Sequence, residues 1–143
     1  MCSLNKKIKD ALKEMEGYNI KEFLLEHNIR VYSTLQLENG EDGFLCNDKI
    51  IVRKHLPRNY RKFVVLHEIG HFIMHSNDSL AFSYTQLGHR NKLEVEANMF
   101  ACLKLLENDI LEEVNVVSSL LNKGVPEQIA FKFIEWYITQ KES

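Results

Sequence analysis

The segment His67-Glu68-Ile69-Gly70-His71 has the residue types and spacing of a metal-binding helix. Residues four apart on an α-helix project from the same face, so the two imidazoles can reach one ion. A catalytic zinc site uses three protein ligands and keeps its fourth position for water. The spacing therefore predicts that His67 and His71 bind Zn²⁺ and that Glu68, beside the open position, acts as general base.

A third protein ligand is needed, and a following helix is the expected source. Glu94 is the candidate, on a helix expected from about residue 92 after a polar stretch over 76–90. Asn91 and Glu94 also fit a capping box, in which the glutamate only satisfies the start of the helix. Asn98 lies one turn beyond Glu94 and suits a hydrogen bond to a ligating imidazole, although an exposed helical asparagine fits the spacing equally well.

The residue that would stabilise a developing oxyanion is not fixed by spacing. Tyr60, His75, Tyr84 and His89 are all candidates. His75 lies a further turn along the motif helix, which favours a structural role over a ligand role. Gly70 costs about 1 kcal/mol relative to alanine inside a helix, so it predicts close packing of another backbone. A further alternative is that the native protein binds no metal and the motif helix is only part of the hydrophobic core.

The elements that position these residues follow from hydrophobic periodicity and turn signals. Helices are expected over about 4–17, 20–26, 57–75, 92–106, 109–122 and 126–140, the last after a stop at Gly124. Alternation after Ile29 and the run at 49–53, with turns at Asn39-Gly40 and Asn47-Asp48, predict a short, mostly antiparallel sheet. The fold class is therefore α+β, with five to six helices and the motif on the central one.

Length and composition narrow the class of protein. The chain has 143 residues, 45% of them hydrophobic and 27% charged, which predicts one folded domain over 1–143. A formal net charge of -2 argues against a direct nucleic-acid partner. No apolar run suits a signal peptide or a membrane span, and three scattered cysteines, with Cys102 expected in the core, suit a reducing cytoplasm.

The two motifs together resemble the ImmA/IrrE family of metallo-endopeptidases. The family pattern reads H-E-x-G-H, then a loop, then E-x-x-A-N-x-F-A, which here are residues 67–71 and 94–101. Gly43, the strand at 49–52 and the approach over 61–66 are also similar, so the resemblance covers roughly residues 29–106. Family members often continue with a leucine pair and Met-Pro, whereas this chain continues with Leu105-Leu106-Glu107.

The resemblance implies a zincin-like domain, similar to gluzincins, in which His67, His71 and Glu94 bind zinc, Glu68 is the base and Asn98 supports a ligand. It also implies cleavage of a helix-turn-helix transcriptional repressor, often one from a mobile genetic element. Substrates of such peptidases pair with an exposed strand edge, for which 49–53 is the expected candidate. The alternative is a noncatalytic, zinc-stabilised module that binds and regulates a repressor.

Overall fold

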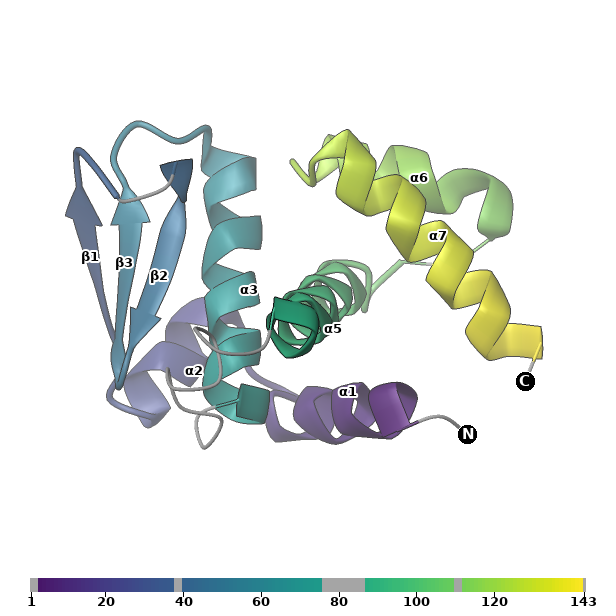
Figure 1. Cartoon of the computed structure of the whole chain (residues 1–143), viewed down its shortest axis with the longest axis horizontal. Helices are drawn as coiled ribbons and strands as arrows, with labels where there is room; N and C mark the ends of the chain where they lie inside the picture. The colour runs from purple at the N-terminus through teal and green to yellow at the C-terminus, as the bar shows by residue number, and fades with distance from the viewer. Residues whose placement is uncertain (1–2, 38–39, 76–86, 110–111, 143) are drawn as a thin grey trace.

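The computed structural model describes residues 3–37, 40–75, 87–109 and 112–142. In chain order the elements are α1 (Ser3–Glu14), α2 (Ile20–Glu26), β1 (Arg30–Thr34), β2 (Gly43–Cys46), β3 (Lys49–Arg53), α3 (Arg58–His75), α5 (Leu87–Leu105), α6 (Glu113–Asn122) and α7 (Glu127–Glu142). Figure 1 shows the sheet on one side of α3, with α5 crossing on the other side and the α6–α7 pair beyond it. The expected α+β fold, with the motif on a central helix, is confirmed.

The sheet has the strand order β1-β3-β2 and is mixed. β2 and β3 form an antiparallel hairpin whose turn, Asn47-Asp48, has a left-handed residue at Asn47 (φ 56°), as a tight hairpin turn requires. β1 pairs with the other edge of β3 in parallel. The expectation of a mostly antiparallel sheet is therefore wrong for one of the two strand pairs.

Strand β3 lies in the middle of the sheet, which corrects the expectation that 49–53 forms an edge. Its apolar side chains Ile50 and Val52 are fully buried, as a strand paired on both sides and covered by a helix requires. Among the described residues, the edges are β1 and β2. An edge strand thus lies next to α3, but it is β2.

Helices α3 and α5 cross closely because Gly70 leaves room for α5. A methyl group added at Gly70 would lie 2.9 Å from Phe100 Cδ2 and 3.5 Å from Ala97 Cα. The packing reason predicted for a glycine inside the motif is therefore present. Phe100, Ala97 and the adjacent Cys102 are fully buried, so this crossing is part of the main apolar core.

Helix α5 begins earlier than expected, and this removes the capping-box explanation of Glu94. The helix starts at Leu87, so Asn91 lies inside it rather than at its N-cap. Glu94 is then an interior helical residue with its side chain free to interact with α3. The residues over 88–91 lack apolar side chains and so hide this start from hydrophobic periodicity, because a helix turn without apolar residues has no apolar stripe.

Helices α6 and α7 dock onto the start of α3 through the turn between them. Gly124, at φ 87°, ends α6 with hydrogen bonds from its own N–H to Leu121 O and from Val125 N to Leu120 O, both 3.0 Å. The stop predicted at Gly124 is confirmed. A methyl group there would lie 2.5 Å from Tyr60 N, so the turn touches the backbone of α3 directly.

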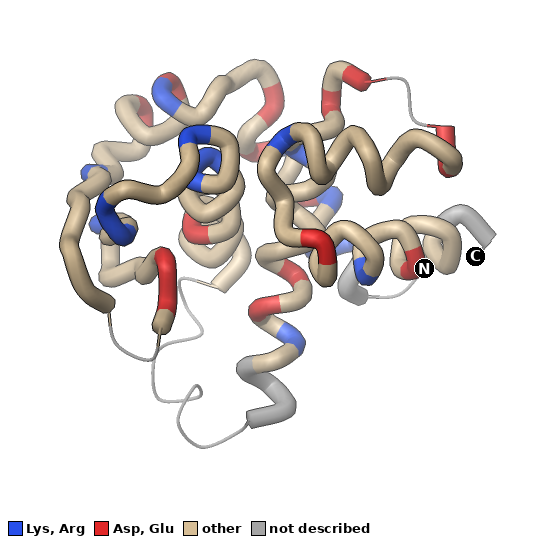
Figure 2. The backbone as a smooth tube through the Cα atoms, turned by 90° about the horizontal axis from the view of Figure 1, so that it is seen from above, with Lys and Arg blue, Asp and Glu red and all other residues tan. Residues whose placement is uncertain are grey.

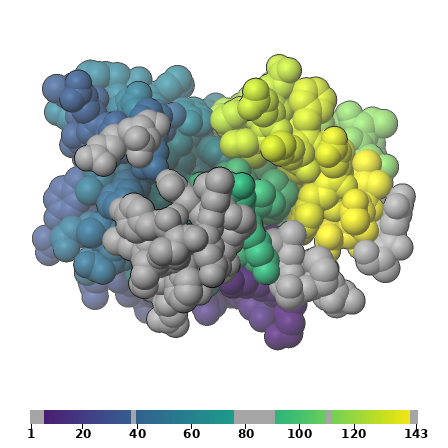
Figure 3. All heavy atoms as spheres, viewed as in Figure 1, coloured from purple at the N-terminus to yellow at the C-terminus, as the bar shows by residue number. Residues whose placement is uncertain are grey.

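Charged residues of both signs are distributed over the helices, as the tube in Figure 2 shows. The space-filling view in Figure 3 has the sheet and the C-terminal helices on opposite sides of the molecule. Within the described ranges, no helix is long and apolar enough to cross a membrane. The described cysteines, Cys46 and Cys102, are free thiols, and Cys102 is buried in the core as expected.

We expect Gly124→Ala to destabilise the protein more than Gly17→Ala. Both glycines have positive φ, which costs alanine about 1 to 2 kcal/mol, but only Gly124 touches other atoms. Overpacking against Tyr60 should add about 1 to 3 kcal/mol to the loss. Urea unfolding of both variants measures the difference, and equal losses would contradict the docking contact.

Candidate metal and catalytic site

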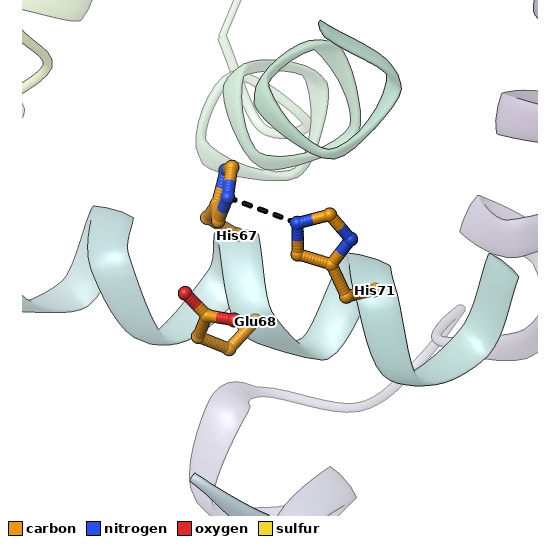
Figure 4. A group of neighbouring side chains, drawn as sticks. All are labelled: His67, Glu68 and His71. Atoms are coloured by element: carbon orange, nitrogen blue, oxygen red, sulfur yellow. Dashed lines mark hydrogen bonds between the residues drawn. The ribbon is translucent and has the colours of Figure 1, made fainter. Parts of the chain in front are cut away.

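Three motif residues leave α3 in the arrangement that the spacing predicts. Figure 4 shows the rings of His67 and His71 pointing toward the neighbouring helix and Glu68 leaving in another direction. The two Nε2 atoms lie 3.1 Å apart. Ligand atoms of His67, Glu68 and His71 all lie within 4.8 Å of one another, so this part of α3 has the donors of a metal site.

The carboxylate of Glu94, on α5, joins the two imidazoles. One oxygen lies 2.8 Å from Nε2 of His71 and the other 3.1 Å from Nε2 of His67. The Glu94 side chain is 49% exposed, whereas the two rings are 13% and 14% exposed. The group therefore has a carboxylate at the surface and imidazoles beneath it.

This donor set fits a divalent cation of the zinc type. Nitrogen and oxygen atoms bound to one tetrahedral zinc at about 2.0 to 2.2 Å are separated from each other by roughly 3.3 to 3.6 Å. The three observed separations, 2.8 to 3.1 Å, are within a few tenths of an ångström of that range. Two imidazoles and one carboxylate also match the ligand types of catalytic zinc sites.

Asn98 fixes the protonation of His67. Its Oδ1 lies 2.7 Å from Nδ1 of His67, and an amide oxygen only accepts hydrogen bonds. Nδ1 must therefore carry the proton, which leaves Nε2 of a neutral ring with its lone pair toward Glu94 and His71. Such a partner on the remote ring nitrogen is what metal-bound histidines commonly have.

The pKa directions show how charge is balanced among these groups. Burial raises the pKa of Glu94, but the adjacent imidazoles of His67 and His71 outweigh that effect and hold the pKa well below its usual range. Burial lowers the pKa of His71 overall, whereas for His67 the hydrogen bond and charge of Glu94 and the charge of Glu68 reverse that effect. A negative carboxylate thus faces two imidazoles that compete for positive charge.

Glu68 is enclosed between α3 and strand β2. Its residue is 6% exposed, and a methyl group added at Gly43 would lie 3.1 Å from Oε2 of Glu68 and 2.5 Å from Cγ1 of Val64. Only glycine lets β2 approach the helix this closely. Burial raises the pKa of Glu68 to about 7, an effect to which the negative charges of Glu94 and Glu41 add.

Of the four candidates for stabilising an oxyanion, the structure describes the side chains of two, Tyr60 and His75. The hydroxyl of Tyr60 donates to Asp42 Oδ2 at 2.6 Å, and burial together with Asp42 raises the pKa of Tyr60. His75 lies against His71, with 2.8 Å between their Nδ1 atoms. Tyr84 lies outside the described residues, and so does the side chain of His89 in the first turn of α5.

Sequence reasoning missed Glu96, whose Oε1 lies 2.8 Å from Nε2 of His75. Glu96 is two residues from Glu94 and so projects from a different face of α5. No spacing rule connects it to the motif helix, and its near-complete burial, at 1% exposed, is visible only in the folded chain.

Comparison with protein families agrees with this geometry. Residues 24–118 match the model of the IrrE N-terminal-like domain, peptidase M78. The chain belongs to this family. The match spans most of the chain and both motifs, and it identifies the protein as a peptidase of a metallopeptidase family. No curated protein and no solved structure shows significant similarity to the chain. Helices α1 and α7 lie outside the matched residues of this M78 member.

We expect metal-free protein to gain thermal stability when zinc is added, because a ligand bound only by the native state shifts the unfolding equilibrium. At a free zinc concentration of 100 Kd the gain is about 2.7 kcal/mol, which corresponds to several degrees in Tm. Glu94→Gln should lose most of this shift, whereas Glu26→Gln, an exposed glutamate of α2, should keep it. Differential scanning fluorimetry with and without a chelator makes the measurement. An undiminished shift in Glu94→Gln would contradict the ligand assignment.

Proposed function

We propose that the chain is a zinc-dependent endopeptidase that cleaves a regulatory protein, with His67, His71 and Glu94 as zinc ligands and Glu68 as general base. The observation that carries the proposal is the convergence of a carboxylate from α5 on two imidazoles from α3, beside a buried glutamate. Membership of a metallopeptidase family supports it.

Zinc, when bound, polarises a carbonyl group and makes water acidic near neutral pH. The protein's residues do the remaining work. Glu68 lies close enough to the two histidines to reach a water between them and the substrate, since its ligand atom is within 4.8 Å of theirs. It takes the proton of the attacking water and delivers it to the nitrogen of the departing amine.

The burial of Glu68 suits this proton transfer. A carboxylate with a pKa near the working pH can both accept and release a proton, whereas an ordinary exposed glutamate releases it too readily. Burial raises the pKa of Glu68 to about 7. A bound cation would lower that value, because positive charge nearby favours the ionised form.

Strand β2 is the proposed docking edge for substrate. Peptides commonly add to an exposed strand through backbone hydrogen bonds, and among the described strands β2 has a neighbour on one side only. Gly43, at the start of β2, lies against Glu68. A peptide paired with β2 would therefore pass close to the base.

The proposed substrate is a helix-turn-helix transcriptional repressor, of the kind associated with mobile genetic elements. This part of the proposal rests on the family resemblance, and the chain's near-neutral charge leaves DNA recognition to the substrate. The cytoplasm is the matching location. The rival function is a noncatalytic module whose zinc only stabilises a repressor-binding surface.

Glu68→Gln is expected to lower peptide hydrolysis by at least about 100-fold, because loss of a general base typically costs 10²- to 10⁴-fold. Zinc content should remain near that of the wild type, since Glu68 is not a proposed ligand. The measurement is coexpression with a helix-turn-helix repressor, sought first among proteins encoded near this chain, followed by detection of a discrete fragment. Wild-type cleavage that persists in Glu68→Gln would contradict its role, and repressor regulation without any cleavage would favour the noncatalytic module.

Gly43→Ala is expected to slow turnover while zinc binding is retained. The new methyl group must displace Val64 or Glu68, and misplacing a catalytic group by about 1 Å can cost roughly 100-fold. Gly40→Ala is the control for general destabilisation, because its φ of 69° strains alanine whereas its added methyl group meets nothing within 4 Å. Fragment formation and zinc content are compared in both variants, and wild-type turnover in Gly43→Ala would contradict the placement of Glu68 under β2.

A further inference from the structure

A line of buried polar groups leads away from His71 on the side opposite Glu94. Nδ1 of His71 lies 2.8 Å from Nδ1 of His75, and Nε2 of His75 lies 2.8 Å from Oε1 of Glu96. The side chains of His75 and Glu96 are only 3% and 1% exposed. Lys7 of α1, at 3.6 Å from Glu96 Oε1, adds a positive charge at the far end.

The direction of each hydrogen bond in this line follows from the chemistry of its ends. The Glu96 carboxylate only accepts, so Nε2 of His75 must be its donor. A neutral imidazole carries one proton, which leaves Nδ1 of His75 as an acceptor. Nδ1 of His71 must then donate to it, and Nε2 of His71 keeps its lone pair for the face shared with Glu94.

We propose that His75 and Glu96 are positioning residues that hold His71 in the orientation and tautomer required to bind zinc. The proposal rests on the proposed function, because it takes His71 as a ligand. His75 here replaces the carboxylate or carbonyl that usually receives the second N–H of a metal-bound histidine, and Glu96 stands one step further out. His67 has the ordinary arrangement instead, with Asn98 as direct acceptor.

The position of the line in the fold explains why it needs residues from three helices. His75 ends α3, Glu96 lies in α5 and Lys7 lies in α1, which is outside the residues matched by the family model. A carboxylate as buried as Glu96 is costly without partners. Its contacts with His75 and Lys7 offset that cost, so α1 contributes to the surroundings of His71 through Glu96.

The test is the affinity of the full-length protein for zinc, measured by competition with a chromophoric chelator after the metal has been removed. His75→Phe keeps a ring but deletes the acceptor, and it should weaken zinc binding about 10- to 100-fold. His75→Gln offers both an acceptor for His71 and a donor for Glu96, so it should restore most of the affinity. Glu96→Met should weaken binding as well.

A double variant distinguishes a connected line from two separate packing defects. If Glu96 acts through His75, then His75→Phe combined with Glu96→Met should bind zinc no more weakly than His75→Phe alone. Losses that multiply would overturn the proposal. Failure of His75→Gln to restore affinity would also overturn it, because that result is expected if His75 is itself a ligand.

Lys104→Met is the matched control for general destabilisation. Lys104 is buried and also joins α5 to α1, with a hydrogen bond of 3.1 Å to Met15 O, but it takes no part in the line from His71. The Lys104→Met variant should bind zinc as tightly as the wild type. If His75→Phe and Glu96→Met bind zinc as tightly as this control, the positioning role is overturned. Circular dichroism verifies that each variant is folded. If the wild type itself binds no zinc, the proposed function fails instead.

Discussion

The site depends on holding together four atoms whose lone pairs face one another. Such atoms repel one another unless a positive charge lies among them. Two imidazole nitrogens and the two oxygens of Glu94 face each other at 2.8 to 3.1 Å where α3 crosses α5. The crossing is held by apolar packing immediately beneath, with Gly70 against Phe100 and Ala97. Buried apolar surface thus stabilises a polar arrangement that cannot stabilise itself, and a cation then benefits from donors already in place.

Each imidazole also needs a hydrogen-bond partner on Nδ1, the ring nitrogen remote from Glu94. A neutral imidazole has two tautomers, and only the one protonated at Nδ1 leaves Nε2 free toward Glu94. For His67 the choice is made by a single amide, Asn98, one helical turn from Glu94. For His71 the nearest polar group is another imidazole, so the choice depends on where that second ring finds a partner of its own.

How much of this site could be predicted from the sequence depends on whether its contacts are local. The pairing of His67 with His71, and of Glu94 with Asn98, follows from the 3.6-residue period of a helix and needs no knowledge of the fold. The placement of Glu68 under Gly43 and of Glu96 beside His75 depends on how elements cross in space, and no period encodes that. The predicted edge position of 49–53 was wrong for a related reason, because alternation identifies strands but not their neighbours.

The two acidic residues of the site are chemically identical in the sequence, and their surroundings are what assigns them different roles. Glu94 is half exposed and lies against both imidazoles, and their proximity holds its pKa well below the usual range for a carboxylate. Glu68 is enclosed by α3 and β2, and burial raises its pKa to about 7. A metal ligand must stay ionised, whereas a base must exchange protons near neutral pH, so environments that separate two pKa values in this way favour Glu94 as ligand and Glu68 as base. If the roles were exchanged, the enclosed Glu68, which binds a proton near neutral pH, would have to coordinate the cation. Glu94, which stays ionised, would have to accept and return a proton. Neither environment supports this exchange.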